Sequence, residues 1–165
     1  MKVASNSSPL IHLAQVNALF LLKELYGEVV ITEEVRAEAV ERGKEEGCAD
    51  AILIKDAIET GAIKVVRHGT ARDFSRFGLH EAEANVISLV LNEKFDLILL
   101  DEDAARELAR MLGLKVRGSI GVIIEALRKK RITRKEALKF LNELASVMYL
   151  SGEAYREARE AIEKA

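Results

Sequence analysis

The segment from residue 95 to residue 109 constrains the fold of this chain more than any other. Residues 97–100 are continuously apolar rather than alternating, which is typical of a strand that is buried on both faces of a parallel sheet. Three acids follow at positions 101–103, and apolar residues then recur at helical spacing. The pattern predicts a buried strand that leads into a helix, with the acids at the carboxyl end of the strand, where open α/β sheets bind ligands.

The same change from strand pattern to helix pattern repeats along the chain. We expect strands at residues 1–5, 28–31, 63–66, 97–100 and 114–116, with helical patterns between them. Strands that alternate with helices predict a three-layer α/β/α fold with a central, mainly parallel sheet. Right-handed crossovers in such a fold bring the turns from strand to helix to one edge of the sheet.

Residues with the chemistry of helix caps mark several helix ends. Ser8 precedes Pro9, which predicts a helix with Ser8 as its N-cap, and Gly27 is expected to end that helix. Thr32, Thr133 and Ser151 are expected to cap later helices.

The chain is expected to form one compact domain. It has 165 residues, of which 49% are hydrophobic, and this is enough to bury a sizeable core. We predict a core domain at residues 1–130, while residues 131–165 contain helix patterns without strands. We therefore expect the last part to be a C-terminal helical extension that packs on the same domain.

Composition limits the classes of function and location. A net charge of −2 gives no sign of general nucleic-acid affinity, so any such contact must use a local patch. Arg128 and Lys129 begin the one concentrated basic stretch, which either contacts RNA phosphates or complements the dipole at a helix C-terminus. A single cysteine excludes an intramolecular disulfide, and no apolar run is long enough to span a bilayer. We expect a cytoplasmic protein without a membrane partner.

Four short segments follow one another in a specific order. They are Ser-Asn-Ser-Ser-Pro-Leu-Ile at 5–11, Leu-His-Glu-Ala-Glu-Ala-Asn-Val-Ile-Ser-Leu at 79–89, Leu-Leu-Asp-Glu-Asp at 99–103 and Gly-Ser-Ile-Gly-Val at 118–122. Together they resemble the PIN-domain family, and in particular a prokaryotic PIN-like branch of uncharacterised proteins that is related to VapC-type toxin ribonucleases of toxin–antitoxin modules.

The resemblance implies an endoribonuclease that depends on Mg²⁺ or Mn²⁺ and holds the metal between carboxylates at the sheet edge. Hard divalent cations prefer oxygen ligands, polarise a phosphate and activate water. Glu83 and Asp101 are the implied catalytic pair. The implied metal ligands are Asn6, Glu38, Glu83, Asp101 and Asp103, and the implied substrate contacts are Ser7, Ser8, Ser119, Arg128 and Lys129. The resemblance also implies an RNA substrate, a cognate antitoxin and a homodimer.

One position departs from the family pattern. Active PIN nucleases typically have Asp where this chain has Asn6, and an amide brings an oxygen ligand without a negative charge. A weakened PIN-like module that binds RNA or protein is therefore the alternative function.

Simpler roles remain open for individual residues. Acids in a first helical turn, and serines such as Ser8 and Ser119, also serve as caps. His12 and His80 are expected to be non-catalytic. A doubly wound phosphate-binding domain such as a receiver is the third alternative, but no glycine-rich loop follows the first strand.

Overall fold

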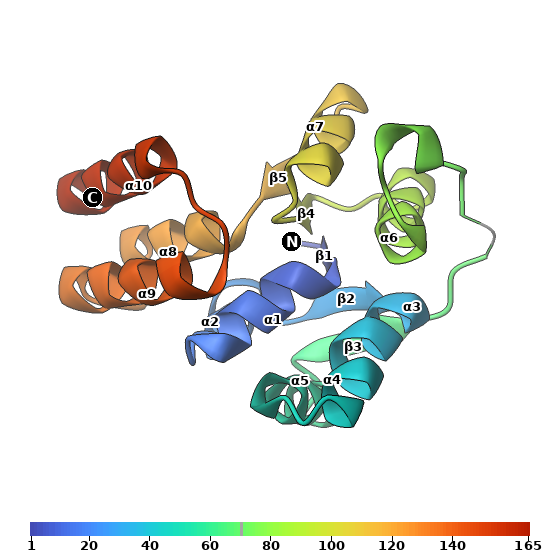
Figure 1. Cartoon of the computed structure of the whole chain (residues 1–165), viewed down its shortest axis with the longest axis horizontal. Helices are drawn as coiled ribbons and strands as arrows, with labels where there is room; N and C mark the ends of the chain where they lie inside the picture. Colours follow the sequence, from blue (N-terminus) through green and yellow to red (C-terminus); the bar gives the residue numbers. More distant parts are fainter. Residues whose placement is uncertain (70) are drawn as a thin grey trace.

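The computed structural model describes residues 1–69 and 71–165. A five-stranded sheet in the order β3-β2-β1-β4-β5 lies at its centre, and every neighbouring pair of strands is parallel. The strands are β1 (Val3–Ser5), β2 (Val29–Thr32), β3 (Ile63–Val66), β4 (Leu97–Leu99) and β5 (Val116–Arg117). Helices cover the sheet (Figure 1), and this confirms the predicted three-layer α/β/α class.

Helices lie between the strands, as the alternating pattern predicts, and after the last strand. They are α1 (Ser7–Gln15), α2 (Phe20–Tyr26), α3 (Glu33–Arg36), α4 (Arg42–Glu45), α5 (Ala49–Glu59), α6 (Glu81–Asn92), α7 (Asp103–Met111), α8 (Ser119–Arg128), α9 (Arg134–Val147) and α10 (Gly152–Lys164). Two short turns complete the elements: a π-helical turn, η1 (Ala37–Glu41), and a 3₁₀ turn, η2 (Ser75–Phe77).

The strand order reverses direction between β1 and β4. The chain moves outward from β1 to β2 and β3, and then returns to place β4 on the other side of β1. Right-handed crossovers consequently put α1, α2 and α5 on one face of the sheet and α6 and α7 on the other. The carboxyl ends of β1 and β4 flank this topological switch point, which is where open α/β sheets bind ligands.

The continuous apolar run before the acids has the predicted cause. Every residue of β4 is buried, and so is Leu100, because β4 lies inside the sheet with helices on both faces. Its neighbour β1 is also fully buried. The two central strands therefore hold the following turns rigidly.

The first helix differs from the prediction in two ways. Helix α1 begins at Ser7, so the N-cap position belongs to Asn6 and Pro9 is the third helical residue. The predicted cap role of Ser8 is wrong, because the Ser8 hydroxyl donates instead to the carboxylate of Glu102. The single predicted helix is also two helices, and Asn17, with φ of 58°, lies in the turn between them. An asparagine tolerates this left-handed conformation better than most residues do.

The other predicted caps are confirmed. Thr32 accepts a hydrogen bond from the backbone of Val35 at 3.2 Å, and Thr133 accepts one from Glu136 at the same distance. Ser151 accepts a hydrogen bond from the backbone of Ala154 at 3.1 Å.

The C-terminal helices pack on the rest of the chain. Figure 1 shows α9 and α10 beside α8, at the left of the view. Apolar side chains on both helices are fully or almost fully buried: Ala137, Leu141, Leu144, Ala158 and Ile162. The polar helix α10 therefore has an apolar stripe that is covered within the chain, although the predicted division at residue 130 stays a prediction.

Candidate functional site

The turns after β1 and β4 lie side by side. Ser5 is paired with Leu99 in the sheet, and the backbone N–H of Asn6 donates to the carbonyl of Leu99 at 3.1 Å. Because the strands are parallel and in this register, Asn6 and Asp101 emerge at the same edge. The predicted meeting of these two turns is thereby explained by the central strand pair.

Asn6 is the most unusual side chain at this edge. It is only 1% exposed, yet neither its amide oxygen nor its amide nitrogen has a hydrogen-bond partner among the residues that the structure describes. Burying an amide without partners is unfavourable and rare in folded proteins. The amide oxygen and nitrogen of Asn6 could therefore both bind a ligand.

Asp101 is held by three donors. The backbone N–H of Ser119 donates to Oδ1 at 2.7 Å, and the Ser119 hydroxyl donates to Oδ2 at 2.6 Å. Nδ1 of His12 lies 2.6 Å from the same Oδ2. Burial alone would raise the pKa of Asp101, but the hydrogen bonds from His12 and Ser119 outweigh it and hold that pKa below its ordinary value. Asp101 is therefore an ionised carboxylate in a largely dry place.

These three bonds also limit what Asp101 can bind. A carboxylate offers about four acceptor positions, and three donors already use most of them. Asp101 can therefore supply one further oxygen contact without losing a bond that it already has.

Two consecutive serines of helix α1 donate hydrogen bonds to further carboxylates. The hydroxyl of Ser7 donates to Oε1 of Glu38 at 2.6 Å, and the neighbouring Ser8 hydroxyl donates to Glu102. Glu38 lies in the π-helical turn η1, and such turns occur frequently at functional sites because they change the direction of a helical side chain. The serines therefore connect acids from two distant parts of the chain.

Glu83 lies in the first turn of α6, and its side chain is 5% exposed. Its Oε2 accepts a hydrogen bond from the backbone of His80 at 3.2 Å, which is a local, structural use of the carboxylate. Burial raises the pKa of Glu83, and the negative charges of Glu102 and Glu38 raise it further, against the lowering effect of His80. The charges of these three acids therefore act on one another.

The oxygen atoms at this edge are of the kind that a hard divalent cation prefers, but they do not form a complete set of ligands by themselves. The orphaned amide of Asn6 and the acids around it are the oxygen ligands that Mg²⁺ and Mn²⁺ prefer. In residues 1–69 and 71–165, however, no three His, Cys, Asp or Glu side chains form a group that could hold a metal ion. A cation here would therefore need the Asn6 oxygen and water in addition to one or two carboxylates, which is a common arrangement for Mg²⁺.

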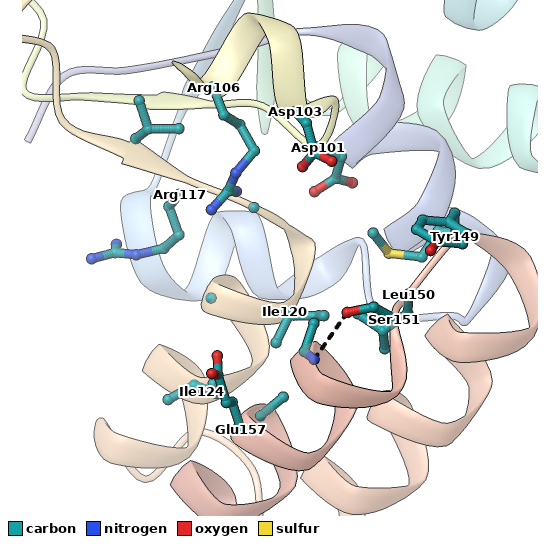
Figure 2. A pocket seen from close by; sticks show the side chains of 16 residues that line it. Asp101, Asp103, Arg106, Arg117, Ile120, Ile124, Tyr149, Leu150, Ser151 and Glu157 are labelled. Carbon is teal, nitrogen blue, oxygen red and sulfur yellow. Dashed lines mark hydrogen bonds between the residues drawn. The ribbon is translucent and has the colours of Figure 1, made fainter. Parts of the chain in front are cut away.

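Of the other predicted residues, Arg128 and Lys129 lie apart from this cluster, whereas Asp103 lies beside Asp101 (Figure 2). Asp103 is exposed at the first position of α7. Arg128 and Lys129 lie at the opposite end of α8 from Ser119, which is about 14 Å away at the helical rise per residue. Their proposed roles stay predictions, and Lys129 forms an ion pair with Glu125 at 3.0 Å.

Sequence reasoning missed or discounted several residues at this edge. Glu102 was expected only as one of three neighbouring acids, and His12 was expected to be non-catalytic, but both contact the cluster directly. A cavity of ≈ 530 Å³ also opens beside Asp101, and Arg106, Arg117 and Tyr149 line it (Figure 2). Arg117 precedes the Gly-Ser-Ile-Gly segment directly, which is the one local signal that could have drawn attention to it.

Within the part of the chain that the structure describes, none of the helices combines the length and the apolar character needed to cross a bilayer.

Comparison with known proteins identifies a family. A family model described as "PIN domain" matches residues 2–164, which is almost the whole chain. No curated protein matches the chain significantly.

Proposed function

The chain belongs to the PIN-domain family, which has a nuclease-type fold, and from this premise we propose that it is a divalent-metal-dependent endoribonuclease. The proposed site lies at the carboxyl edge of β1 and β4, with Mg²⁺ or Mn²⁺ as its cation. The proposal extends to the role of a toxin in a toxin–antitoxin module, with a cognate antitoxin and a homodimer as its partners.

One observation carries the proposal: the side chain of Asn6 is buried at the switch point of the sheet without a hydrogen-bond partner in residues 1–69 and 71–165. The amide oxygen of such a side chain is available to contact a cation or a water bound to it. Ser7 and Ser8, which follow Asn6 directly in the chain, donate hydrogen bonds to the carboxylates of Glu38 and Glu102.

The residues would divide the work as follows. Asn6, Glu83 and Asp101 would hold the cation, which supplies charge stabilisation on the phosphate and an activated water when it is bound. Asp101 would offer its remaining acceptor position while Ser119 and His12 keep the carboxylate ionised and fixed. Burial raises the pKa of Glu83 above its ordinary value, and a bound cation would favour the ionised form of this carboxylate.

A second function is favoured by two specific features. Asn6 removes one negative charge from the ligand set, and Asp101 already serves three donors. Both features weaken divalent binding and support an RNA- or protein-binding module without turnover.

A calorimetric titration distinguishes the two functions. Mn²⁺ and Mg²⁺ would be titrated into the wild type, Asp101→Asn and Asn6→Asp, and each protein would then be incubated with a structured RNA at low salt. Metal binding and cleavage in the wild type, both lost in Asp101→Asn, support the nuclease. A silent wild type together with metal binding in Asn6→Asp supports the binding module. Cleavage that persists unchanged in Asp101→Asn would rule out the proposed site.

A further inference from the structure

The cavity beside Asp101 is formed by two distant parts of the chain. One wall comes from β5 and the start of α8, and the other comes from residues 148–151 and α10. Figure 2 shows Asp101 and Asp103 together at one end, with the Arg106 side chain extending into the space near them. The cavity thus adjoins the proposed cleavage site and has a volume of ≈ 530 Å³, which is in the range of small-molecule sites.

Two glycines of the Gly-Ser-Ile-Gly segment make room for arginines. A Cβ atom on Gly118 would lie 2.5 Å from Nη1 of Arg106 and 2.9 Å from Oδ1 of Asp101. A Cβ atom on Gly121 would lie 2.6 Å from Cγ of Arg117. Gly118 has φ of −99°, which any residue can adopt, so its small size and not its backbone freedom is what the position requires. The side chains of Arg106 and Arg117 therefore pack closely against Gly118 and Gly121 in the wall of the cavity.

The guanidinium groups of Arg106 and Arg117 differ in how far other side chains already use their charge and their N–H donors. Arg117 is engaged, because its Nη1 pairs with Glu125 and donates to the hydroxyl of Tyr26 at 3.0 Å. Arg106 donates from Nη1 to the carbonyl of Leu100 at 3.0 Å, and this is its one hydrogen bond to the described residues. Arg106 forms no ion pair with the described residues, unlike Arg117, so its charge and its remaining N–H donors are available to a ligand.

The opposite wall carries apolar side chains and an exposed aromatic ring, together with the polar Ser151 and Glu157. Tyr149 is 88% exposed, and Met148 and Leu150 also line the cavity on this side. The connection that holds Tyr149 is anchored at both ends, because the backbone N–H of Met148 donates to Leu144 and Ser151 caps α10. A tyrosine on such a short, fixed connection can serve as a stacking surface at little cost in conformational entropy.

We propose that this cavity binds one unpaired nucleotide of single-stranded RNA next to the phosphate to be cleaved. The base stacks on Tyr149 beside Met148 and Leu150, and Arg106 contacts a backbone phosphate. The base must be unpaired, because a base inside a duplex does not expose its face to an aromatic side chain. The carboxylates of Asp101, Asp103 and Glu157 in the lining disfavour a free nucleoside triphosphate, which carries several negative charges on adjacent groups. This inference rests on the proposed function for its choice of RNA.

Binding without cleavage tests the proposal. Fluorescence anisotropy would follow a fluorescein-labelled single-stranded RNA at low salt in EDTA, with the wild type, Tyr149→Ala, Tyr149→Phe and Arg106→Gln. Phe20→Ala is the matched control, because Phe20 is an exposed aromatic residue on α2 that does not line the cavity. The RNA duplex of the same sequence is the second probe.

We expect Tyr149→Ala to weaken single-strand binding roughly 5- to 100-fold, the effect of losing one base–aromatic stack. Tyr149→Phe should keep the affinity, because it keeps the ring. Arg106→Gln should weaken binding and reduce the slope of log affinity against log salt by about 1, as expected for one lost phosphate contact. Duplex binding should be the same for the wild type and Tyr149→Ala.

Two results would overturn the inference: a wild type that does not bind the single strand, or a Tyr149→Ala variant that binds it as well as Phe20→Ala does. The outcome is separable from that of the nuclease proposal, because EDTA removes the cation. A wild type that binds through Tyr149 but never cleaves with Mn²⁺ supports this inference and rejects the nuclease. A protein that cleaves RNA with unchanged KM in Tyr149→Ala rejects this inference alone.

Discussion

Asp101 is expected to stabilise the fold as well as to bind a cation. In Asp101→Ala the backbone N–H and the hydroxyl of Ser119, a residue with 0% exposure, lose their acceptor, and His12 loses its partner. An unsatisfied buried donor costs roughly 1–3 kcal/mol, so the two donors of Ser119 together correspond to about 2–6 kcal/mol. The Ser119 hydroxyl can rotate toward another acceptor, and we therefore expect a loss in the lower half of that range.

Asp101→Asn should be far less destabilising. The amide oxygen can still accept from the backbone of Ser119, while the amide nitrogen can donate to the Ser119 hydroxyl or to Nδ1 of a neutral His12. We expect a loss of about 1 kcal/mol, mainly from weaker, uncharged hydrogen bonds. Asp103→Ala is the control, because this neighbouring acid is exposed and its removal affects only the helix dipole, worth about 0.3–1 kcal/mol.

Urea unfolding at pH 7 without divalent metal measures these differences directly. The expected order of unfolding free energy is wild type, then Asp103→Ala and Asp101→Asn close together, then Asp101→Ala well below. If Asp101→Ala is as stable as Asp103→Ala, the three hydrogen bonds do not stabilise the fold and the account of this carboxylate is wrong. The experiment also shows which variant is suitable for the activity assays.

Three further predictions concern other parts of the chain. Glu83→Gln should raise the unfolding free energy at pH 7, because burial raises the pKa of Glu83 and the ionised form is therefore disfavoured in the fold. The same substitution should weaken Mn²⁺ binding. Thermal melts with and without Mn²⁺ measure both effects. Burial would raise the pKa of Glu125, but hydrogen bonds from Tyr26 and Lys129 and the charge of Arg117 hold it below the ordinary 4.5, so its contribution to stability is present above that value and is lost as the pH falls through the lower, folded-state pKa. The stability advantage of the wild type over Glu125→Gln should consequently shrink as urea unfolding is repeated from pH 7 down to below pH 4, and an advantage that does not change with pH contradicts this assignment. Ile162→Ala should destabilise the protein by about 2–4 kcal/mol in urea, since the side chain is fully buried in α10, whereas the exposed Tyr149→Ala should stay within about 0.5 kcal/mol of the wild type.

Much of the fold could be predicted because its signals are local. The run of apolar residues before Asp101 indicates a buried parallel strand, and helical periodicity depends only on neighbours three or four positions apart. The caps at Thr32, Thr133 and Ser151 were predicted correctly for the same reason, since each side chain bonds a backbone N–H three residues later. The meeting of the turns after β1 and β4 at the carboxyl edge of the sheet also followed, because parallel strands with right-handed crossovers bring their following turns together.

The sequence alone therefore determined the α/β class, most element positions, and the edge of the sheet at which Asn6 and Asp101 meet. Tertiary structure decided what the side chains at that edge contact. Ser8 bonds Glu102 across 94 positions, and His12 bonds Asp101 across 89, so no local pattern could distinguish a cap from a partner of an acid. The need for a glycine at position 118 could not be predicted either, because Arg106, which would clash with a side chain there, comes from another helix. Local backbone preferences are encoded over a few residues, whereas a site is assembled from distant segments that meet only when the core is packed.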